Sequence, residues 1–293
     1  MLSFTHFSAL FQADKQGHQQ GYENMLCSLP AQPPLSHVKD MSCLPLPFAT
    51  LSAIIWHKTQ QPVPYSDAVF LMESYVRAMS HDKTIPPLLW LLEHPPLYTQ
   101  GMSSLEGDGP SQTGMLPLYK SGRGGGYTYH GPGQRILYAM MSLSHAHHPT
   151  LTIAHYIQWL HDWCGCSLAH LGIIAVRRGQ QSGLWVSVGG VYKKIAFFGI
   201  RMRHGMSFHG VSINAHCALE PFRHIRPCGY DGQDITSLSA LGRPSSLRHV
   251  DDALLEDLRA SYDALSRKGQ HPCHIIQQTS QACPTLSSIL SRA

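Results

Sequence analysis

The residues with the clearest chemical potential lie in RGGGYTYHGPGQ, residues 123–134. This stretch places five glycines and one proline around a single histidine. Glycine lets the backbone approach a ligand closely, so the stretch is either a structural turn or the wall of a pocket. It is not a phosphate-binding loop, because no GK[ST] follows and the spacing of a dinucleotide fingerprint is missing. The candidate ligands that remain for such a pocket are an acyl chain, a carbonyl group or a carboxylate.

Cys228 is the second chemical candidate. Pro227 and Gly229 flank it, which places the thiol on a rigid, turning backbone rather than inside a strand or helix. The alternative is an inert buried thiol, the usual state of a free cysteine. A thiol becomes a good nucleophile at neutral pH when a nearby cation lowers its pKa.

Lys193 and Lys194 are the nearest candidates for that cation, in the apolar run VYKKIAFFGI. Side chains alternate along a strand, so only one of the two lysines can share a face with Ala196 and Phe198. The alternative is that both are solvated at a strand end, because lysine is rarely buried. Of three histidines near the motifs, His130 either lines a pocket or orders the loop by a hydrogen bond. His94 and His209 have the same two alternatives, and we expect them to lie behind the pocket wall.

Composition narrows the class of protein. The chain has 293 residues, 43% hydrophobic and 14% charged, which indicates a globular protein rather than a disordered or membrane protein. The eight cysteines are irregularly spaced without paired CxxC motifs, so we expect no metal, no cofactor and a reducing cytoplasm. A mitochondrial leader is the less favoured alternative. The net charge of +4 is scattered, which suits acidic protein partners and not nucleic acid.

The elements that must position these residues follow from hydrophobic spacing. We expect helices over residues 66–79, 151–173 and 251–267, the second closed by Gly172 and the third capped by its first aspartates. Strands are expected over residues 88–94, 134–143, 183–203 and 206–216. Without regular strand–helix alternation, this order predicts an α+β fold. Residues 1–50 should be a poorly structured extension, 51–268 the catalytic domain and 269–293 an irregular tail.

Five motifs together resemble the lipoyl(octanoyl) transferase family: EHPPLYTQG, RGGGYTYHGPGQ, KKIAFFGI, SFHGVSIN and PCGY, in this order. The resemblance covers residues 51–265. It implies a fold like that of biotin and lipoate protein ligases, with a mixed, largely antiparallel sheet flanked by helices. It also implies an acyltransferase that moves octanoate from acyl carrier protein to a lysine of a lipoyl domain, in a 2-oxoacid dehydrogenase or the glycine cleavage H protein.

The resemblance also assigns site residues. Cys228 would carry the acyl thioester, and Lys194 would lower its pKa. The implied substrate pocket comprises Arg123, Gly124, Gly125, Gly126, Tyr127, Thr128, Tyr129, His130, Phe197, Phe198, Gly199, Gly210, Val211 and Ser212. We expect a monomer that binds neither nucleic acid nor membrane. Two positions depart from the family pattern, Lys193 in place of arginine and the charged Arg135 after Gln134.

Two alternative functions stay open at this point. An ATP-dependent lipoate or biotin ligase on the same fold would adenylate a free acid and need no cysteine. A catalytically silent member would hold a lipoyl domain or an acyl group without transferring it. The HGPGQ and PCG motifs disfavour the first alternative, and the presence of both Lys194 and Cys228 disfavours the second.

Overall fold

The computed structural model describes residues 52–110, 116–143, 152–178, 181–227, 234–267 and 273–291. The expected N-terminal extension and Cys228 lie outside these ranges. The strands are β1 (Ala53–Thr59), β2 (Leu88–Leu92), β3 (Leu97–Gln100), β4 (Leu118–Lys120), β5 (Tyr127–His130), β6 (Gln134–Ser142), β7 (Val176–Arg178), β8 (Gln181–Val188), β9 (Val191–Arg203), β10 (Met206–Asn214) and β11 (His274–Ser280). The α-helices are α3 (Tyr65–His81), α4 (Ile153–His170), α5 (Leu247–Arg267) and α6 (Leu286–Leu290), with 3-10 helices at Glu220–His224 and Ser239–Leu241.

The main sheet has eight strands in the order β11-β1-β2-β6-β10-β9-β8-β7. Strand β1 pairs in parallel with β11 and with β2. Every further pairing, from β2 across to β7, is antiparallel. The expected α+β fold with a mixed, largely antiparallel sheet is therefore confirmed.

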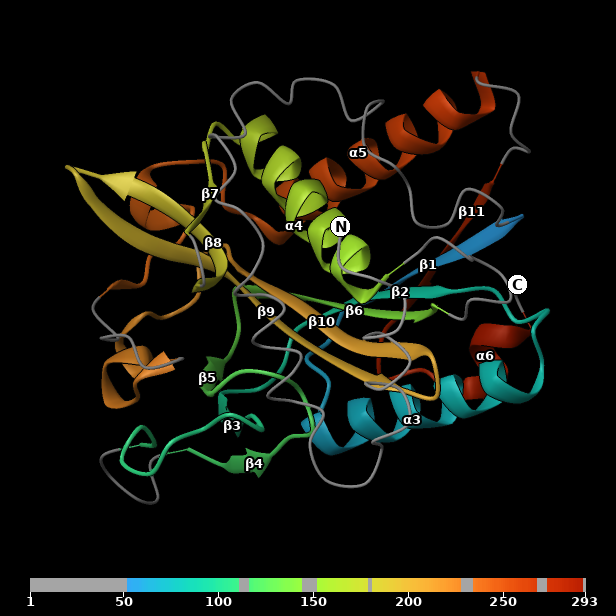
Figure 1. Ribbon diagram of the computed structural model, residues 1–293, viewed down its shortest axis with the longest axis horizontal. Coiled ribbons are helices and arrows are strands. Elements are labelled where there is room, and N and C mark those ends of the chain that lie inside the picture. The colour runs from blue at the N-terminus through green and yellow to red at the C-terminus, as the bar shows by residue number, and fades with distance from the viewer. Residues whose placement is uncertain are drawn as a thin grey trace, which may run out of the picture.

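Helices cover both faces of this sheet, with α4 and α5 on one side and α3 and α6 on the other (Figure 1). Strand β2 shows how the sequence meets both layers. Leu89 and Leu91 join the core shared with α4 and α5, whereas Leu88, Trp90 and Leu92 join the core shared with α3. A strand covered on both faces is apolar throughout, which is why its pattern does not alternate.

A smaller sheet, in the order β4-β3-β5, lies beside the main sheet (Figure 1). The glycine-rich motif joins the two sheets, because it runs through β5 and then turns into β6. Gly133 makes that turn with a φ of 82°, and a Cβ there would lie 2.7 Å from the backbone nitrogen of Cys217. Only glycine fits such a backbone without strain.

The helices expected near the start and middle of the chain form as α3 and α4. Helix α4 ends as predicted, since Gly172 has a φ of 77° and the Ile173 N–H returns to the Leu168 carbonyl at 2.9 Å. None of the helices among the described residues is long and apolar enough to cross a bilayer.

Helix α5 differs from its expected start. It begins at Leu247, so Asp251 lies inside the helix rather than at its cap. The Asp251 carboxylate instead forms an ion pair with Arg135, with an Nε–Oδ1 distance of 2.7 Å, and another with Lys58. Arg135 is thus explained as the buried partner of an aspartate, because a buried charge must be paired.

The C-terminal stretch also differs from the expectation of an irregular tail. Strand β11 adds to the main sheet beside β1, and α6 lies beside α3. Strand β11 carries several polar side chains, so it lacks the apolar pattern by which a strand is predicted from the sequence. The His57 ring nitrogens bond to Gln278 Oε1 at 3.2 Å and to Ser280 Oγ at 2.9 Å, so its polar residues serve a buried network that sequence patterns do not reveal.

Candidate active site

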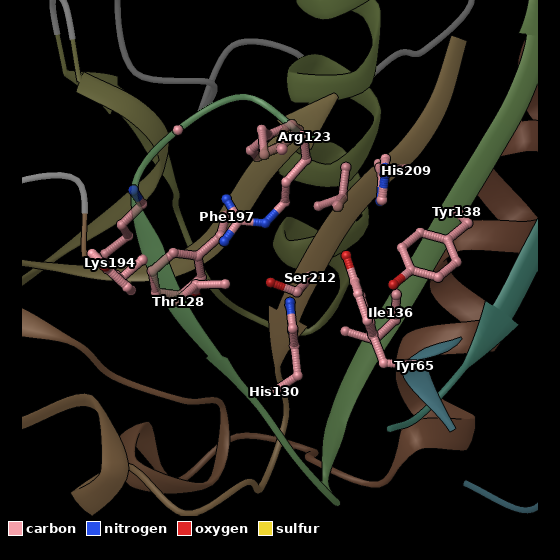
Figure 2. A pocket seen from close by; sticks show the side chains of 16 residues that line it. Tyr65, Arg123, Thr128, His130, Ile136, Tyr138, Lys194, Phe197, His209 and Ser212 are labelled. Atoms are coloured by element: carbon pink, nitrogen blue, oxygen red, sulfur yellow. The ribbon is translucent and has the colours of Figure 1, made fainter. Parts of the chain in front are cut away.

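A pocket of about 500 Å³, counting its part open to solvent, lies between the main sheet and the loop that leads into β5 (Figure 2). Strands β5, β6, β9 and β10 supply most of its wall, and the start of α3 supplies Tyr65. Its lining residues are Tyr65, Arg123, Gly125, Tyr127, Thr128, His130, Ile136, Tyr138, Lys194, Phe197, Phe198, Gly199, His209, Gly210, Val211 and Ser212.

Strand register explains how distant motifs meet in this pocket. Gly210 of β10 pairs with Gly199 of β9 on one side and with Tyr138 of β6 on the other. A Cβ at Gly210 would lie 2.1 Å from the Leu137 carbonyl oxygen, so a larger residue does not fit. The glycines of KKIAFFGI and SFHGVSIN therefore let the strands that form the pocket floor lie close to their neighbours.

Arg123 crosses above this floor and fastens the glycine-rich loop. Its Nη2 donates to the Thr99 carbonyl and to the Gly126 carbonyl, each at 2.9 Å, and its Nη1 donates to the Gly124 carbonyl at 2.9 Å. A Cβ at Gly199 would lie 2.8 Å from Arg123 Cδ. The arginine thus holds the loop shape and brings a buried positive charge to the pocket.

His130 begins a buried hydrogen-bond chain. Its Nδ1 lies 2.7 Å from Gln134 Oε1, and Gln134 Nε2 donates to Asn214 Oδ1 at 2.9 Å. Asn214 Nδ2 donates to the Thr236 carbonyl at 2.9 Å, and the Thr236 N–H donates to the Lys194 carbonyl at 2.9 Å. Because an amide oxygen only accepts, Nδ1 carries the proton and Nε2 is left as an acceptor.

A second histidine orders the opposite wall. His94 Nδ1 donates to the Val63 carbonyl at 2.6 Å, so its Nε2 accepts from the Tyr138 hydroxyl at 2.7 Å. The Tyr65 hydroxyl donates to Ser121 Oγ at 2.8 Å. His94 itself does not line the pocket, and its role is to orient Tyr138.

Lys194 is buried, with 1% of its surface exposed, whereas Lys193 is partly exposed. Its Nζ lies 4.7 Å from the centre of the Phe197 ring and 5.5 Å from that of Trp185. Gly183 makes room, because a Cβ there would lie 2.3 Å from Lys194 Cε. The pairing of β8 with β9 shifts register at this point, so strict alternation fails and Lys194 lies against Phe197 rather than beside Phe198.

The predicted nucleophile, Cys228, lies outside the described residues. The cysteines inside the described ranges are free thiols, and burial raises the pKa of each: Cys164 well above its usual value, Cys166 and Cys217 to about 12, Cys273 and Cys283 to about 11. Thiols with such pKa values are poor nucleophiles. None of these cysteines lines the pocket.

The structure collects most of the expected substrate residues in this one pocket, although their roles stay predictions. Gly124, Gly126 and Tyr129 do not line it. The first two hold Arg123 through their carbonyls, and Tyr129 packs edge-on against Phe222. Sequence reasoning missed Tyr65, Ile136 and Tyr138 as pocket residues, and it placed His209 outside the pocket wall. Alternation along β6 from Gln134 could have indicated Ile136 and Tyr138.

The buried histidines make stability depend on pH. Burial lowers the pKa of His94 to about 4 and that of His209 to about 3, so both are neutral in the folded protein. Their contribution is complete above the unfolded pKa of about 6.5 and is lost as the pH falls toward the folded values, because the unfolded chain then binds more protons. We expect each histidine to cost about 3 kcal/mol of unfolding free energy between about pH 7 and pH 4.

Urea unfolding at several pH values across that range measures this dependence. The unfolding free energy of the His209→Asn variant should change less with pH, because the contribution of His209 is removed. An unfolding free energy that stays constant between neutral and acidic pH would contradict the assignment of neutral buried histidines.

Comparison with known proteins defines the class first. The sequence profile of the lipoyl protein ligase A/B catalytic domain matches residues 64–259. The fold is similar to that of a bipartite lipoate protein ligase from Thermoplasma acidophilum, with a TM-score of 0.59 and 15% identity over 83% of this chain and 90% of that one. The chain therefore belongs to the lipoyl protein ligase A/B class, whose fold it shares.

Closer relatives then give the family. An octanoyltransferase of Wolbachia sp. subsp. Brugia malayi (strain TRS) is 39% identical over 202 residues, which span 69% of this chain and 96% of that protein. An octanoyltransferase of Caulobacter vibrioides (strain ATCC 19089 / CIP 103742 / CB 15) is 40% identical over 211 residues, which span 71% of this chain and 89% of that protein. The chain belongs to the octanoyltransferase family, as its motifs predicted.

Proposed function

We propose that this acyltransferase moves an octanoyl group from octanoyl-acyl carrier protein to a lysine of a lipoyl domain, the first step of protein lipoylation. The acceptors are lipoyl domains of 2-oxoacid dehydrogenases and the H protein of glycine cleavage. One observation carries the proposal beyond family membership. The buried amine of Lys194, the ring of Phe197 and the glycine-rich loop line the same pocket. This arrangement suits acyl transfer through a thiolate, because a cation lowers the pKa of a nearby thiol and the glycines let the backbone approach an acyl chain.

The first step forms an acyl-enzyme. The Cys228 thiolate attacks the carbonyl carbon of the donor thioester, a new carbon–sulfur bond forms, and the carrier's sulfur leaves and takes up a proton. One thioester replaces another, so no ATP is needed. The Lys194 ammonium lowers the pKa of the Cys228 thiol by favouring its charged form.

The described chain on either side of Cys228 supports this pairing. Pro227, immediately before it, is buried. Ile235, seven residues after Cys228 in the sequence, forms a β-bridge with Lys194. Because the chain returns to Lys194 within so few residues, it can hold the thiol near the amine.

The second step transfers the acyl group to the acceptor. The lysine of the lipoyl domain must lose one proton to solvent before its nitrogen attacks the acyl carbon. The nitrogen releases a second proton to solvent as the amide forms, the carbon–sulfur bond breaks, and Cys228 leaves as the thiolate. Burial, followed by the charges of neighbouring groups, lowers the pKa of His130 well below its usual range, so it is a weak base. Its bond to Gln134 supports the role of holding the loop rather than of taking this proton.

The pocket wall suits an aliphatic tail. Phe197 stacks on Phe222 with ring centres 5.3 Å apart, and Ile136 adds aliphatic surface. Burying an octanoyl tail contributes on the order of 5 kcal/mol at about 0.8 kcal/mol per methylene group. This energy holds the substrate while the polar groups at the Lys194 end act on its carbonyl.

Transfer without ATP is the expected result that separates this function from that of a ligase. Purified enzyme, octanoyl-carrier protein and a lipoyl domain should give octanoylated domain in nucleotide-free buffer, detected as a mass gain of one octanoyl group. Free octanoate with ATP is the matched control and should give no product. Product formed only from free octanoate and ATP would contradict the proposal and indicate a ligase.

We also propose that the enzyme works in the cytoplasm. The free thiols of the described cysteines fit a reducing compartment. The monomeric state stays a prediction from the sequence.

A further inference from the structure

His209 is a pocket residue to which the proposed chemistry gives no task. Its imidazole lines the pocket and is 3% exposed. The ring meets that of Tyr138 edge-on, with centres 5.8 Å apart, and stacks on the neighbouring Phe208 ring at 5.3 Å. A buried polar ring inside an otherwise suitable acyl pocket needs a physical explanation.

The backbone at His209 is strained in a way that aims this side chain. Its φ is 59°, a left-handed conformation that is uncommon for residues other than glycine. The side chains of Ser207 and Val211, on either side in the alternation, face α4: Ser207 Oγ bonds the Tyr156 hydroxyl at 3.1 Å, and Val211 joins the core with α4 and α5. Regular alternation would send His209 to that same face. The left-handed turn brings its ring to Tyr138 on the opposite face, and strain of this kind clusters at functional sites.

The imidazole of His209 also makes no hydrogen bond to any other residue in the described ranges, unlike the nearby His94 and His130, whose ring nitrogens do. Burial, followed by the charges of Arg123, Arg201 and His94, lowers the pKa of His209 and keeps its ring neutral. A neutral imidazole has one donor and one acceptor nitrogen. Both need water or a polar partner when a guest fills the pocket.

Along β10, His209 is separated from the Lys194 end of the pocket by about the length of an octanoyl chain. The Lys194 amine lies against Phe197, which pairs with Ser212 of β10. His209 is three residues from Ser212 on the same strand, which corresponds to about 10 Å. An extended eight-carbon chain, with carbon–carbon bonds of about 1.5 Å, has about that length. Figure 2 shows Lys194 and His209 on opposite sides of the group, with Phe197 and Ser212 between them.

We propose that His209 is the end wall of the acyl pocket and sets the upper limit of acyl chain length at about eight carbons. This inference rests on the proposed octanoyl transfer. An octanoyl tail ends at the ring, whereas a longer tail must press hydrocarbon against the imidazole nitrogens and exclude the water that satisfies them. His209 thereby selects the length of the substrate without touching its reacting carbonyl.

The His209→Gly variant tests the inference, because it removes the ring and relieves the left-handed strain. Wild type and variant are mixed with butanoyl, octanoyl, decanoyl and dodecanoyl thioesters of carrier protein, and the acylated fraction is followed with time by intact mass. We expect loading with decanoyl relative to octanoyl to rise about tenfold, the change that burying two further methylene groups produces. His209→Asn keeps a shorter polar group. Its loading with decanoyl relative to octanoyl should lie between the values for wild type and His209→Gly.

His204→Gly is the matched control. His204 has a φ of 50° in the exposed turn between β9 and β10, so the substitution is chemically the same and lies outside the pocket. It should leave the chain-length profile unchanged.

The outcomes separate the inference from the function on which it rests. If wild type loads no acyl group from any donor, the proposed function fails. If wild type loads octanoyl and folded His209→Gly shows the same length profile, or loads no chain at all, the end-wall inference is overturned. If His209→Gly does not fold, the profile of His209→Asn decides by the same criteria.

Discussion

The Cys228→Ala variant is expected to lose octanoyl transfer by about a thousandfold or more while it remains folded. The physical reason is that none of the cysteines in the described ranges can take the place of the thiolate. Every cysteine in the described ranges has a pKa raised by burial. The rate of transfer from octanoyl-carrier protein to a lipoyl domain measures the loss, and thermal unfolding checks the fold.

Cys283→Ala is the matched control for this variant. Cys283 is partly buried near the C-terminus and does not line the pocket, so its removal should leave the transfer rate unchanged. Full activity in Cys228→Ala, or a comparable loss in both variants, would show that the thiol of Cys228 is not the nucleophile.

Lys194→Met is the second variant with a large expected effect. Methionine keeps the length of the side chain in the space beside Phe197 and Trp185, but it removes the charge. Without that cation the Cys228 thiol is protonated at neutral pH, so the transfer rate should fall by about a hundredfold or more. The pH dependence of Cys228 alkylation, followed by peptide mapping, should shift toward higher pH in the variant.

The neighbouring Lys193→Met offers a strict comparison. The same charge is removed one residue away, from a partly exposed position outside the pocket. Its transfer rate and its alkylation profile should match those of wild type. If the two variants behave alike, the cation that matters is not Lys194.

Much of the site could be predicted because its motifs fix local backbone shape. Gly199 is required by the close approach of Arg123, Gly210 by that of the neighbouring strand β6, and Gly133 by that of the backbone at Cys217. That requirement is visible in the sequence as glycine within the motifs. Strand alternation correctly separated a buried lysine from a partly exposed one. Alternation predicted the wrong neighbour for Lys194, because the register shift between β8 and β9 places Lys194 against Phe197 rather than beside Phe198.

Other features arise from tertiary packing and have no local signal. Tyr65 reaches the pocket from the first turn of a helix whose spacing indicates only an amphipathic face. The side chain of His209 enters the pocket because its φ is positive. Regular alternation along the strand predicts this side chain on the opposite face of the sheet. Strand β11 was missed because it lies at the edge of the sheet and carries polar side chains that join a buried hydrogen-bond network. It therefore lacks the apolar residues that mark a strand.

The central claim is that Cys228 carries the acyl group between donor and acceptor. Intact-mass measurement of the enzyme mixed with octanoyl-carrier protein, without a lipoyl domain, tests it most directly. The account predicts a gain of one octanoyl group, located by peptide mapping on Cys228, which disappears when a lipoyl domain is added. An unmodified enzyme that still octanoylates the lipoyl domain at the full rate would contradict it.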